Sequence, residues 1–259
     1  MSQVIAIGNE KGGVAKTTTA LSLGAALTEG GERVLVVDLD PQANLTLSLG
    51  FQPNGLEGTV ADVLLGRDTI PAVSRETGVP GLNLAPSSTQ LQMAERFLGI
   101  REDYELLLKR ALTASQGFDT VLLDCPPALG TITRCALTAA DLLIIPTQCE
   151  FFSAHALKDV LALVKEVRAT TNPLLRYRLL LTMLDRRNRI HRSLYEQVRS
   201  AFGAAVFESV IEVDTRLRES PIFSQPITVY ASRSRGAEQY RQLAKELRSY
   251  AQEAVGTPS

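Results

Sequence analysis

Short apolar runs recur along the chain and are separated by longer segments in which apolar residues return every three or four positions. The runs are continuous rather than alternating, which is typical of strands in a sheet that is covered on both faces. The expected strands lie at residues 4–7, 34–37, 82–85, 120–123, 142–145, 178–182 and 205–207.

The segments between these runs predict helices. Residues 17–27 have helical spacing and stop at Gly30 and Gly31, a common signal for the end of a helix. A long helical region is expected to run up to residue 108. Because strands and helices alternate and parallel crossovers are right-handed, this order predicts an α/β fold with a doubly wound, mostly parallel sheet and helices on both faces.

The chain contains no low-complexity linker and no internal repeat. Its 259 residues suffice for one large α/β domain. Residues 52–80 are rich in Gly, Pro and Thr, and we expect a surface excursion there rather than a domain boundary. The prediction is a single domain over residues 1–255 and a short tail at residues 256–259.

The net charge of −1 conceals an asymmetry between two parts of the chain. Residues 1–164 hold 11 basic and 18 acidic side chains, whereas residues 165–259 hold 16 basic and 10 acidic ones. Seven arginines and only two acids fall within residues 176–199. Such a cluster attracts a polyanion even on a nearly neutral protein, and a solvated helix face is the alternative.

Cysteine content and hydropathy exclude several classes of protein. The three cysteines lack CxxC spacing, which argues against a disulfide framework or a zinc site and favours a reducing cytoplasm. No apolar stretch approaches the roughly 20 residues of a membrane helix. The first expected strand begins too early to leave room for a signal peptide, so a cytoplasmic globular protein is expected.

A glycine loop lies between the first expected strand and the first expected helix. The N–H groups of such a loop and of the following helix N-terminus converge on an anion, and the helix dipole adds favourable potential. In a P-loop, Lys16 would reach the β- and γ-phosphates and the Thr17 hydroxyl would ligate Mg²⁺. The predicted nucleotide site consists of Lys11, Gly12, Gly13, Val14, Ala15, Lys16, Thr17 and Thr18.

Two positions depart from the ordinary Walker A pattern GxxxxGK[ST]. Glu10 stands where the first glycine is expected, and Ala15 replaces the glycine before the lysine. A methyl group at position 15 narrows the approach of the backbone to phosphate, so we expect a slightly adjusted loop geometry.

Together with later segments, this loop resembles the deviant Walker A box of the ParA/MinD family. Residues 38–42 (Asp-Leu-Asp-Pro-Gln) resemble the Walker A′ box of that family, and residues 122–127 (Leu-Leu-Asp-Cys-Pro-Pro) resemble its Walker B box. The similarity continues through residues 148–152, 216–221 and 232–237. Motifs in this order across nearly the whole chain are far more specific than the loop alone, and they resemble a partitioning ATPase of the ParA/Soj type.

Three aspartates follow buried strands at the edge where ligand sites gather in doubly wound sheets. Asp124 ends its strand at the position from which a Walker B acid holds Mg²⁺ through water. A carboxylate after the second strand can orient the attacking water, and by resemblance this role falls to Asp40. Asp38 then lies nearer the metal, or it caps the loop.

The resemblance gives Lys11 a role beyond its own subunit. The signature lysine of the family reaches the nucleotide of the partner subunit, so that two ATP molecules lie between two chains. An extra ammonium on the transferred phosphate neutralises developing charge, as an arginine finger does. Lys11, Lys16 and Asp40 are therefore the expected catalytic residues, ATP and Mg²⁺ are the expected ligands, and a solvent-facing Lys11 is the alternative.

For the base, the family uses the segments after its sixth and seventh strands. They correspond to residues 182–185 and 211–214, and Met183 and Glu212 are the expected contacts. Glu212 stands where the family commonly has proline, so base recognition is the part of the site that the resemblance defines least.

The basic part of the chain holds the candidate DNA contacts. Arg187 and Arg216 fall where Soj-like proteins place DNA-binding arginines on the dimer surface, and Arg186, Arg189 and Arg218 extend the predicted patch. Phosphate contacts from such side chains give binding that depends on salt and tolerates any sequence. Only three residues precede the first strand, so no helix-turn-helix for operator binding is expected before the loop.

Two other functions share the same ATPase core. A MinD-like membrane-cycling ATPase would end in a basic amphipathic helix, whereas here Tyr240, Leu243, Leu247 and Tyr250 form a stripe that we expect to dock on the core. A redox ATPase similar to nitrogenase iron protein would share a cluster across a dimer, and Cys125 does not match the spacing that this needs.

The resemblance thus implies a cargo-positioning switch. ATP closes a homodimer, the dimer binds nucleoid DNA without sequence preference, and slow hydrolysis stimulated by a ParB-type protein releases it. The cargo would be a chromosome, a plasmid or another assembly. The protein would be cytoplasmic, nucleoid-associated and independent of membranes.

Overall fold

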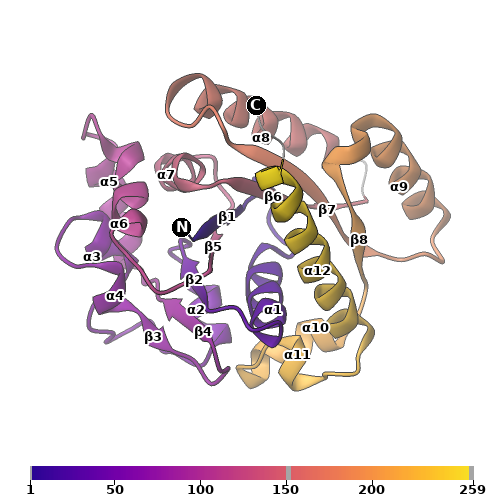
Figure 1. Cartoon of the computed structure of the whole chain (residues 1–259), viewed down its shortest axis with the longest axis horizontal. Helices are drawn as coiled ribbons and strands as arrows, with labels where there is room; N and C mark the ends of the chain where they lie inside the picture. The colour runs from indigo at the N-terminus through magenta and orange to yellow at the C-terminus, as the bar shows by residue number, and fades with distance from the viewer. Residues whose placement is uncertain (1, 150–152, 257–259) are drawn as a thin grey trace.

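The strands of this protein, seen in a computed structural model that describes residues 2–149 and 153–256, form one eight-stranded sheet (Figure 1). The strands are β1 Gln3–Ile7, β2 Val34–Asp38, β3 Arg75–Glu76, β4 Leu82–Ala85, β5 Thr120–Asp124, β6 Leu142–Gln148, β7 Arg176–Leu184 and β8 Val206–Glu212. The helices are α1 Lys16–Glu29, α2 Asn44–Ser48, α3 Val60–Leu64, α4 Ile70–Val73, α5 Gln90–Leu98, α6 Leu107–Thr113, α7 Thr131–Ala139, α8 Ser153–Thr170, α9 Arg189–Phe202, α10 Arg216–Glu219, α11 Ile227–Tyr230 and α12 Arg235–Gly256.

The strand order is β3-β4-β2-β5-β1-β6-β7-β8. Every pair is parallel except β3 with β4, which is antiparallel. The chain starts in the middle of the sheet at β1, builds outward on one side to β4, returns at β5 and then continues on the other side through β6 to β8. This reversal around β1 confirms the predicted doubly wound, mostly parallel sheet, and the carboxyl ends of the central strands are where such sheets bind their ligands.

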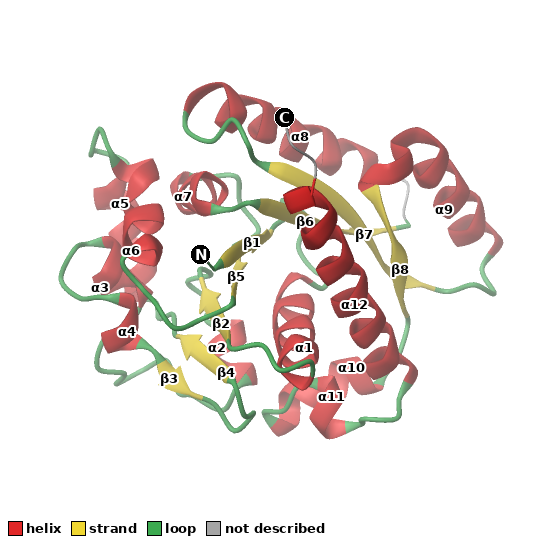
Figure 2. Cartoon of the chain, in the orientation of Figure 1, coloured by secondary structure: helices red, strands yellow, loops and turns green. Residues whose placement is uncertain are grey.

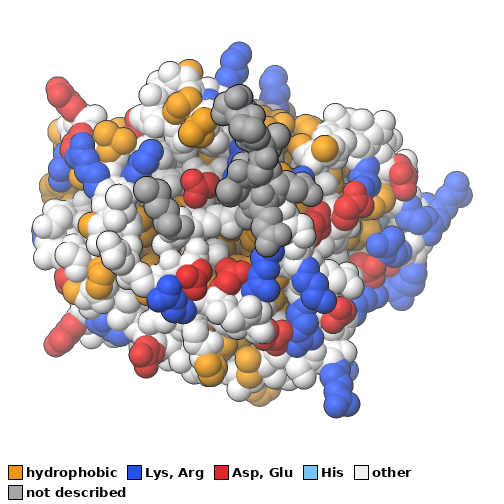
Figure 3. Space-filling view, viewed as in Figure 1, with side chains coloured by type: hydrophobic (Ala, Val, Ile, Leu, Met, Phe, Trp, Pro, Cys, Tyr) orange, Lys and Arg blue, Asp and Glu red, His pale blue; other side chains and the backbone are white. Residues whose placement is uncertain are grey.

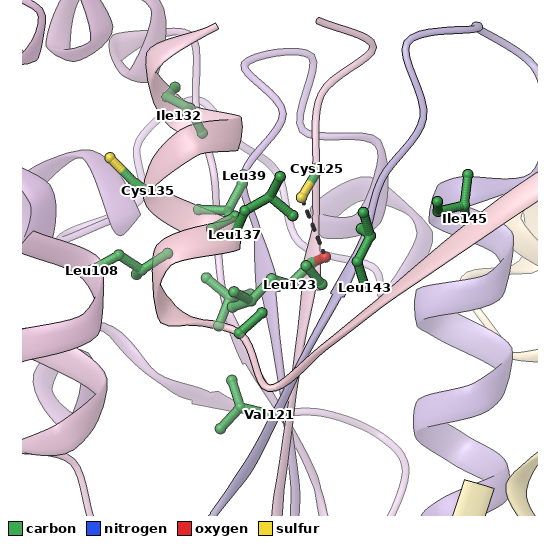
Figure 4. Packing of buried hydrophobic residues seen from close by; sticks show 14 of the residues in the cluster. Leu39, Leu108, Val121, Leu123, Cys125, Ile132, Cys135, Leu137, Leu143 and Ile145 are labelled. Carbon is green, nitrogen blue, oxygen red and sulfur yellow. Dashed lines mark hydrogen bonds between the residues drawn. The ribbon is translucent and has the colours of Figure 1, made fainter. Parts of the chain in front are cut away.

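Both faces of the sheet are covered, because successive residues of each central strand point to opposite sides. In β5, Val121 and Leu123 join a core formed with α3, α5, α6, α7 and α8, whereas Leu122 joins a second core formed with α1 and α12. Figure 2 shows these two helical layers, and Figure 4 shows Leu123 packed near Leu137 of α7. This two-sided burial is why the strands are continuous apolar runs.

The cysteines belong to these cores. Cys125, Cys135 and Cys149 are all buried and form no disulfide. Figure 4 places Cys125 beside Leu143, with its thiol turned towards the Leu123 carbonyl at 3.8 Å. Burial raises the pKa of all three thiols, that of Cys149 to about 11.

The expected helix up to residue 108 is wrong as one element. Helix α5 ends at Leu98, and a 3₁₀ turn at Tyr104–Leu106 leads into α6. Gly99 follows the end of α5, and Asp103 in the connection pairs with Arg110 at 2.6 Å. A glycine and a short acidic loop end a helix more readily than the apolar spacing continues it. Strands β7 and β8 are longer than predicted: β7 already begins at Arg176, and β8 continues past the polar Glu208 and Ser209, which interrupt the apolar run.

The last helix docks on the sheet as the stripe predicted. Tyr240, Leu243 and Leu247 are fully buried in the second core. Tyr250 lies under the guanidinium groups of Arg176 and Arg178, at 4.9 and 4.1 Å from its ring centroid. In the part of the chain that the structure describes, no helix has the length and apolarity needed to cross a membrane. Residues 257–259 of the expected tail lie outside the described residues.

Candidate functional site

The predicted phosphate loop connects β1 to α1 at the carboxyl edge of the sheet. Gly13 has φ +75°, and Ala15, directly before α1, has φ +70°. Both values lie in the left-handed region, which costs an L-residue roughly 1–2 kcal/mol. The loop therefore keeps at Ala15 the conformation that glycine adopts freely, and this strain is the structural consequence of the departure from the ordinary pattern.

The backbone of this loop presents a row of donors without acceptors. Within the described residues, none of the N–H groups of residues 12–18 donates a hydrogen bond, and the first helical bond of α1 runs from Thr19 to the Ala15 carbonyl at 2.9 Å. A Cβ built on Gly12 or Gly13 would meet no atom within 4 Å. Open space faces these donors, which is the arrangement that binds an anion at a helix N-terminus.

Lys16 lies inside this loop. Its side chain is buried, and the ammonium donates to the Lys11 carbonyl at 2.9 Å, so it closes the loop upon itself. Burial lowers the pKa of Lys16, while the nearby carboxylates of Asp124 and Asp40 oppose the shift. A cation held under a row of N–H groups makes the loop strongly attractive to phosphate.

Strand register brings two of the predicted aspartates together. Asp38 and Asp124 end neighbouring strands and stand opposite each other, and Ile7 at the end of β1 is the other neighbour of Asp124. Both carboxyl groups are fully buried. Burial, with mutual repulsion adding to it, raises the pKa of Asp124 well above its ordinary value. Two carboxyl groups thus face each other directly behind the phosphate loop.

Asp124 lacks hydrogen bonds that Asp38 has. Neither oxygen of Asp124 has a hydrogen-bond partner among the described residues. The Thr17 hydroxyl lies close enough to oppose the rise in the pKa of Asp124, but it does not reach hydrogen-bond geometry. An unpartnered buried carboxylate next to a hydroxyl is a site prepared for a cation or for water.

The Asp38 carboxylate accepts hydrogen bonds from the segment that follows β2. It accepts from the Thr46 hydroxyl at 2.7 Å, from the Thr46 amide at 2.9 Å and from the Asp40 amide at 3.1 Å. Burial still raises the pKa of Asp38. Its two oxygens fix the segment that carries Asp40. These hydrogen bonds are compatible with both expected roles of Asp38, capping the loop and lying near the metal.

Asp40 lies two residues after the end of β2. One of its carboxylate oxygens accepts from the Gln42 amide at 2.9 Å, and its side chain is almost buried. The other oxygen has no hydrogen-bond partner among the described residues, so it is available to accept from a water molecule. This placement suits the predicted water-orienting role.

These residues fit a magnesium ion that is coordinated partly by the protein and partly by the phosphates of a nucleotide. Mg²⁺ prefers oxygen ligands and is usually bound by one or two carboxylates plus substrate phosphates. Thr17 and the unpartnered Asp124 supply such oxygens. The described residues contain no group of three or more His, Cys, Asp or Glu side chains that could hold a metal alone, so the fit depends on phosphate oxygens as further ligands.

Two side chains to which the sequence assigned no role of their own contact the loop from β6 and β7. The Gln148 amide donates to the Gly13 carbonyl at 3.0 Å, and the Thr182 hydroxyl donates to the Val14 carbonyl at 3.1 Å. Gln148 also accepts from the Lys11 ammonium at 3.4 Å. The signal in the sequence was that both residues lie in segments, 148–152 and 182–185, that resemble the family. Residues 150–152 of the resembling segment 148–152 lie outside the described residues.

The two predicted base contacts follow neighbouring strands. Met183 near the end of β7 has φ +53°, and its sulfur lies 2.7 Å from the Gln148 amide nitrogen. Glu212 at the end of β8 forms ion pairs with Arg186 at 2.5 Å and with Arg235 at 2.8 Å. The structure thus brings Met183 to the phosphate loop, while the Glu212 carboxylate is already held by two arginines.

The five predicted arginines are all exposed, but they differ in their partners. Arg186 pairs with Glu212, and Arg187 makes a two-pronged contact with Asp185 at 3.0 and 3.1 Å. Arg189, Arg216 and Arg218 have no acidic partner among the described residues. On the face in Figure 3, basic side chains gather over the region of α9 and β8, with acidic ones between them.

Similarity to known proteins agrees with this geometry. A family described as an AAA domain matches residues 2–177. The chain is 43% identical over 249 residues to sporulation initiation inhibitor protein Soj of Bacillus subtilis, covering 95% of this chain and 98% of that protein. It is 39% identical to chromosome partitioning protein ParA of Caulobacter vibrioides, with 95% and 93% covered.

A solved structure has the same fold. Cobyrinic acid a,c-diamide synthase from Mycobacterium smegmatis, with bound ADP and magnesium, superposes with a TM-score of 0.87 and 38% identity, covering 100% of this chain and 99% of that one.

Proposed function

This chain belongs to the ParA/Soj family and is a ParA-like positioning ATPase, and we propose that it binds Mg²⁺ and ATP and dimerises around them. The dimer binds DNA without sequence preference, and slow hydrolysis of ATP releases the DNA. One domain over residues 1–255 carries all of these steps. The observation that carries the proposal is the row of N–H groups at residues 12–18 that have no acceptor in the described protein and surround Lys16.

The nucleotide binds through its phosphates. The N–H groups of Gly12 to Thr18 hold the phosphate oxygens, and Lys16 exchanges its contact with the Lys11 carbonyl for the β- and γ-phosphates. Met183 contacts the base, and Glu212 contributes from the neighbouring strand end. The solved relative with bound ADP and magnesium supports this ligand pair.

Hydrolysis needs a positioned water and neutralised charge. Asp40 accepts a proton of the attacking water, which forms a bond to the γ-phosphorus as the bond to the bridging oxygen of ADP breaks. Thr17 and Asp124 hold Mg²⁺, with Asp38 behind them fixing the segment of Asp40. When bound, Mg²⁺ offsets charge on the phosphate oxygens. Lys16 neutralises the charge that develops on the transferred group.

Lys11 links hydrolysis to dimerisation. In the single chain its ammonium lies at Gln148 of the same subunit. In the dimer Lys11 leaves this contact and reaches the nucleotide of the partner, so that ATP, which carries one more phosphate than ADP, favours the paired state. The pocket is therefore complete only when two copies meet.

The dimer binds DNA through Arg187 and Arg216, with Arg186, Arg189 and Arg218 around them. These side chains follow neighbouring strands β7 and β8, so they lie on one edge of the molecule. A ParB-type protein stimulates hydrolysis and releases the dimer. The protein works in the cytoplasm on the nucleoid.

The name of the solved relative suggests amide synthesis as another activity. Release of ammonia from glutamine commonly uses a cysteine nucleophile, which must be accessible and readily deprotonated. Cys125, Cys135 and Cys149 are buried, and burial raises the pKa of each. The cysteines of this chain do not favour that chemistry, and the partitioning function remains the one that the site supports best.

The proposal is tested by light scattering of the purified chain with Mg²⁺ and a non-hydrolysable ATP analogue. We expect the wild-type protein to form dimers with the analogue and monomers with ADP, and to retain DNA in the dimeric state. Lys16→Ala should abolish both, whereas Lys109→Ala, which removes an exposed lysine of α6, should change neither. A wild-type chain that stays monomeric with saturating analogue would contradict the proposal.

A further inference from the structure

We propose that Gln148 and Thr182 are positioning residues that set the orientation of two successive peptide groups in the phosphate loop. This inference rests on the proposed nucleotide site and assigns to it two side chains from the other half of the sheet. Gln148 ends β6, Thr182 lies in β7, and the sheet register places the two residues opposite each other.

Each side chain holds one carbonyl of the loop. The Gln148 amide donates to the Gly13 carbonyl at 3.0 Å, and the fully buried Thr182 hydroxyl donates to the Val14 carbonyl at 3.1 Å. The described residues contain no cis peptide. The C=O and N–H of a trans peptide point in opposite directions. Holding these two carbonyls towards β6 and β7 therefore turns the N–H groups of Val14 and Ala15 away from the sheet edge.

Those two N–H groups belong to the row without acceptors. Their orientation decides whether they converge on a phosphate, and a glycine-rich loop alone does not decide it, because Gly13 can adopt either sign of φ at little cost. Gly13 has φ +75° and Ala15 has φ +70°, so the segment is held in a left-handed conformation that a free loop would populate only in part. The two contacts keep the loop ready for binding before the ligand arrives.

Gln148 also connects the loop to the rest of the site. Its oxygen accepts from Lys11 at 3.4 Å, and its nitrogen lies 2.7 Å from the sulfur of Met183, the residue after Thr182. One side chain thus contacts the phosphate loop, the lysine predicted to reach the partner and the predicted base contact. A change at Gln148 is expected to affect several steps, so Thr182 gives the cleaner test.

The test measures binding of MgADP and of a Mg-bound ATP analogue by titration calorimetry. Thr182→Val removes the hydroxyl at nearly constant volume and leaves the Val14 carbonyl free to turn. We expect the Kd for both nucleotides to rise about two- to tenfold, which is what one net hydrogen bond is worth. ATPase measurements should show a higher KM with kcat little changed, because the lost hydrogen bond stabilises bound substrate and transition state equally.

Two further variants separate positioning from packing. Thr182→Ser keeps the hydroxyl and should restore wild-type affinity. Thr147→Val is the matched control, because Thr147 is an equally buried threonine of β6 whose hydroxyl contacts the Ile145 carbonyl and not the loop. Thermal melting without nucleotide identifies any variant that is simply unfolded, and Gln148→Leu, which removes the hydrogen bond to Gly13, should then weaken nucleotide binding independently.

The outcomes are distinct. Weaker binding by Thr182→Val, rescue by serine and an unchanged Thr147→Val support the inference. Wild-type affinity in Thr182→Val, or an equal loss in Thr147→Val, overturns it while leaving the proposed function intact. A wild-type chain that binds no nucleotide overturns the proposed function and this inference together.

Discussion

Charge acts differently in the phosphate loop and on the arginine surface. The arginine surface is the exposed group formed by Arg186, Arg187, Arg189, Arg216 and Arg218. In the loop, Lys16 is buried, and the nearby carboxylates of Asp124 and Asp40 oppose the fall in its pKa that burial causes. On the arginine surface, side chains such as Arg187 are exposed, and acids of the same chain neutralise part of the charge. Burial strengthens electrostatic interactions in the first region, whereas water and salt weaken them in the second.

This difference shows that the number of charged residues in a segment does not by itself give the charge available to a ligand. The loop needs few charged groups, because its backbone N–H groups and low exposure make each one effective. The basic segment at residues 176–199 holds seven arginines, yet several are engaged: Arg176 and Arg178 contact Tyr250, and Arg199 pairs with Glu208. Only a part of the charge excess is therefore available to a polyanion.

The largest expected effect concerns the loop region. Asp40→Ala removes the carboxylate that orients water, and we expect the rate of ATP hydrolysis to fall by about 10²–10⁴-fold, the usual contribution of a general base. Nucleotide binding and dimerisation should persist, because Lys16 and the backbone donors remain. The measurements are single-turnover hydrolysis and DNA retention with ATP, and retention should last longer than in the wild type. Fast hydrolysis in this variant would show that another group positions the water.

The arginine surface is tested by comparing two reversals of charge. Arg216 has no acidic partner in the described structure, whereas Arg187 contacts Asp185. Arg216→Glu should weaken DNA binding by the nucleotide-bound dimer roughly tenfold. The slope of log affinity against log salt should fall by about one for each DNA phosphate that the variant no longer neutralises.

Arg187→Glu should have a smaller effect on DNA binding, because part of that charge is already neutralised in the wild type. Dimerisation measured by light scattering should be unchanged in both variants. Equal losses would mean that Asp185 releases Arg187 when DNA binds.

A pH series probes the buried carboxyl group. Because burial raises the pKa of Asp124, the folded chain keeps this proton to a higher pH than the unfolded chain does. The free energy of unfolding therefore falls as pH rises from the ordinary value of 3.8 towards the raised pKa. Asp124→Asn does not titrate, so without ligand its Tm at pH 8 should exceed that of the wild type by about 2–5 °C.

The difference in Tm should shrink as the pH is lowered and disappear below the ordinary pKa of 3.8, where the carboxyl group is protonated in the folded and the unfolded chain alike. Scanning calorimetry gives the comparison. Adding the Mg-bound ATP analogue should stabilise the wild type more than the variant, which lacks the charged oxygens for the cation. A difference in Tm that is independent of pH would contradict the assignment of the raised pKa to Asp124.

The smallest expected effect returns to the arginine surface. Glu212→Gln removes the acid that pairs with Arg186 and Arg235. Releasing these arginines should strengthen DNA binding by about twofold at moderate salt, because exposed ion pairs are weak. Competition binding against the wild-type dimer resolves a change of this size. If the affinity for the ATP analogue changes instead, Glu212 acts in the base pocket.

The residues of the loop show why much of the fold and site could be predicted. A continuous apolar strand, a glycine loop and a helix are adjacent in the chain, so Lys16 and Thr17 had to lie at the helix N-terminus. Asp38 and Asp124 each end a buried strand, and parallel strands end at one edge. The arginines show the opposite case, since the apolar pattern does not indicate which acids neutralise Arg186 and Arg187.

The sequence by itself determined the doubly wound sheet, the phosphate loop and the edge at which the aspartates meet, because these follow from local pattern and from the handedness of crossovers. The tertiary structure alone decided that Asp38 is hydrogen-bonded while Asp124 has no partner among the described residues, and that Thr182 holds Val14 across 168 residues of chain. Hydrogen bonds between distant side chains depend on strand order and register, which bring together groups that have no relation in the linear pattern.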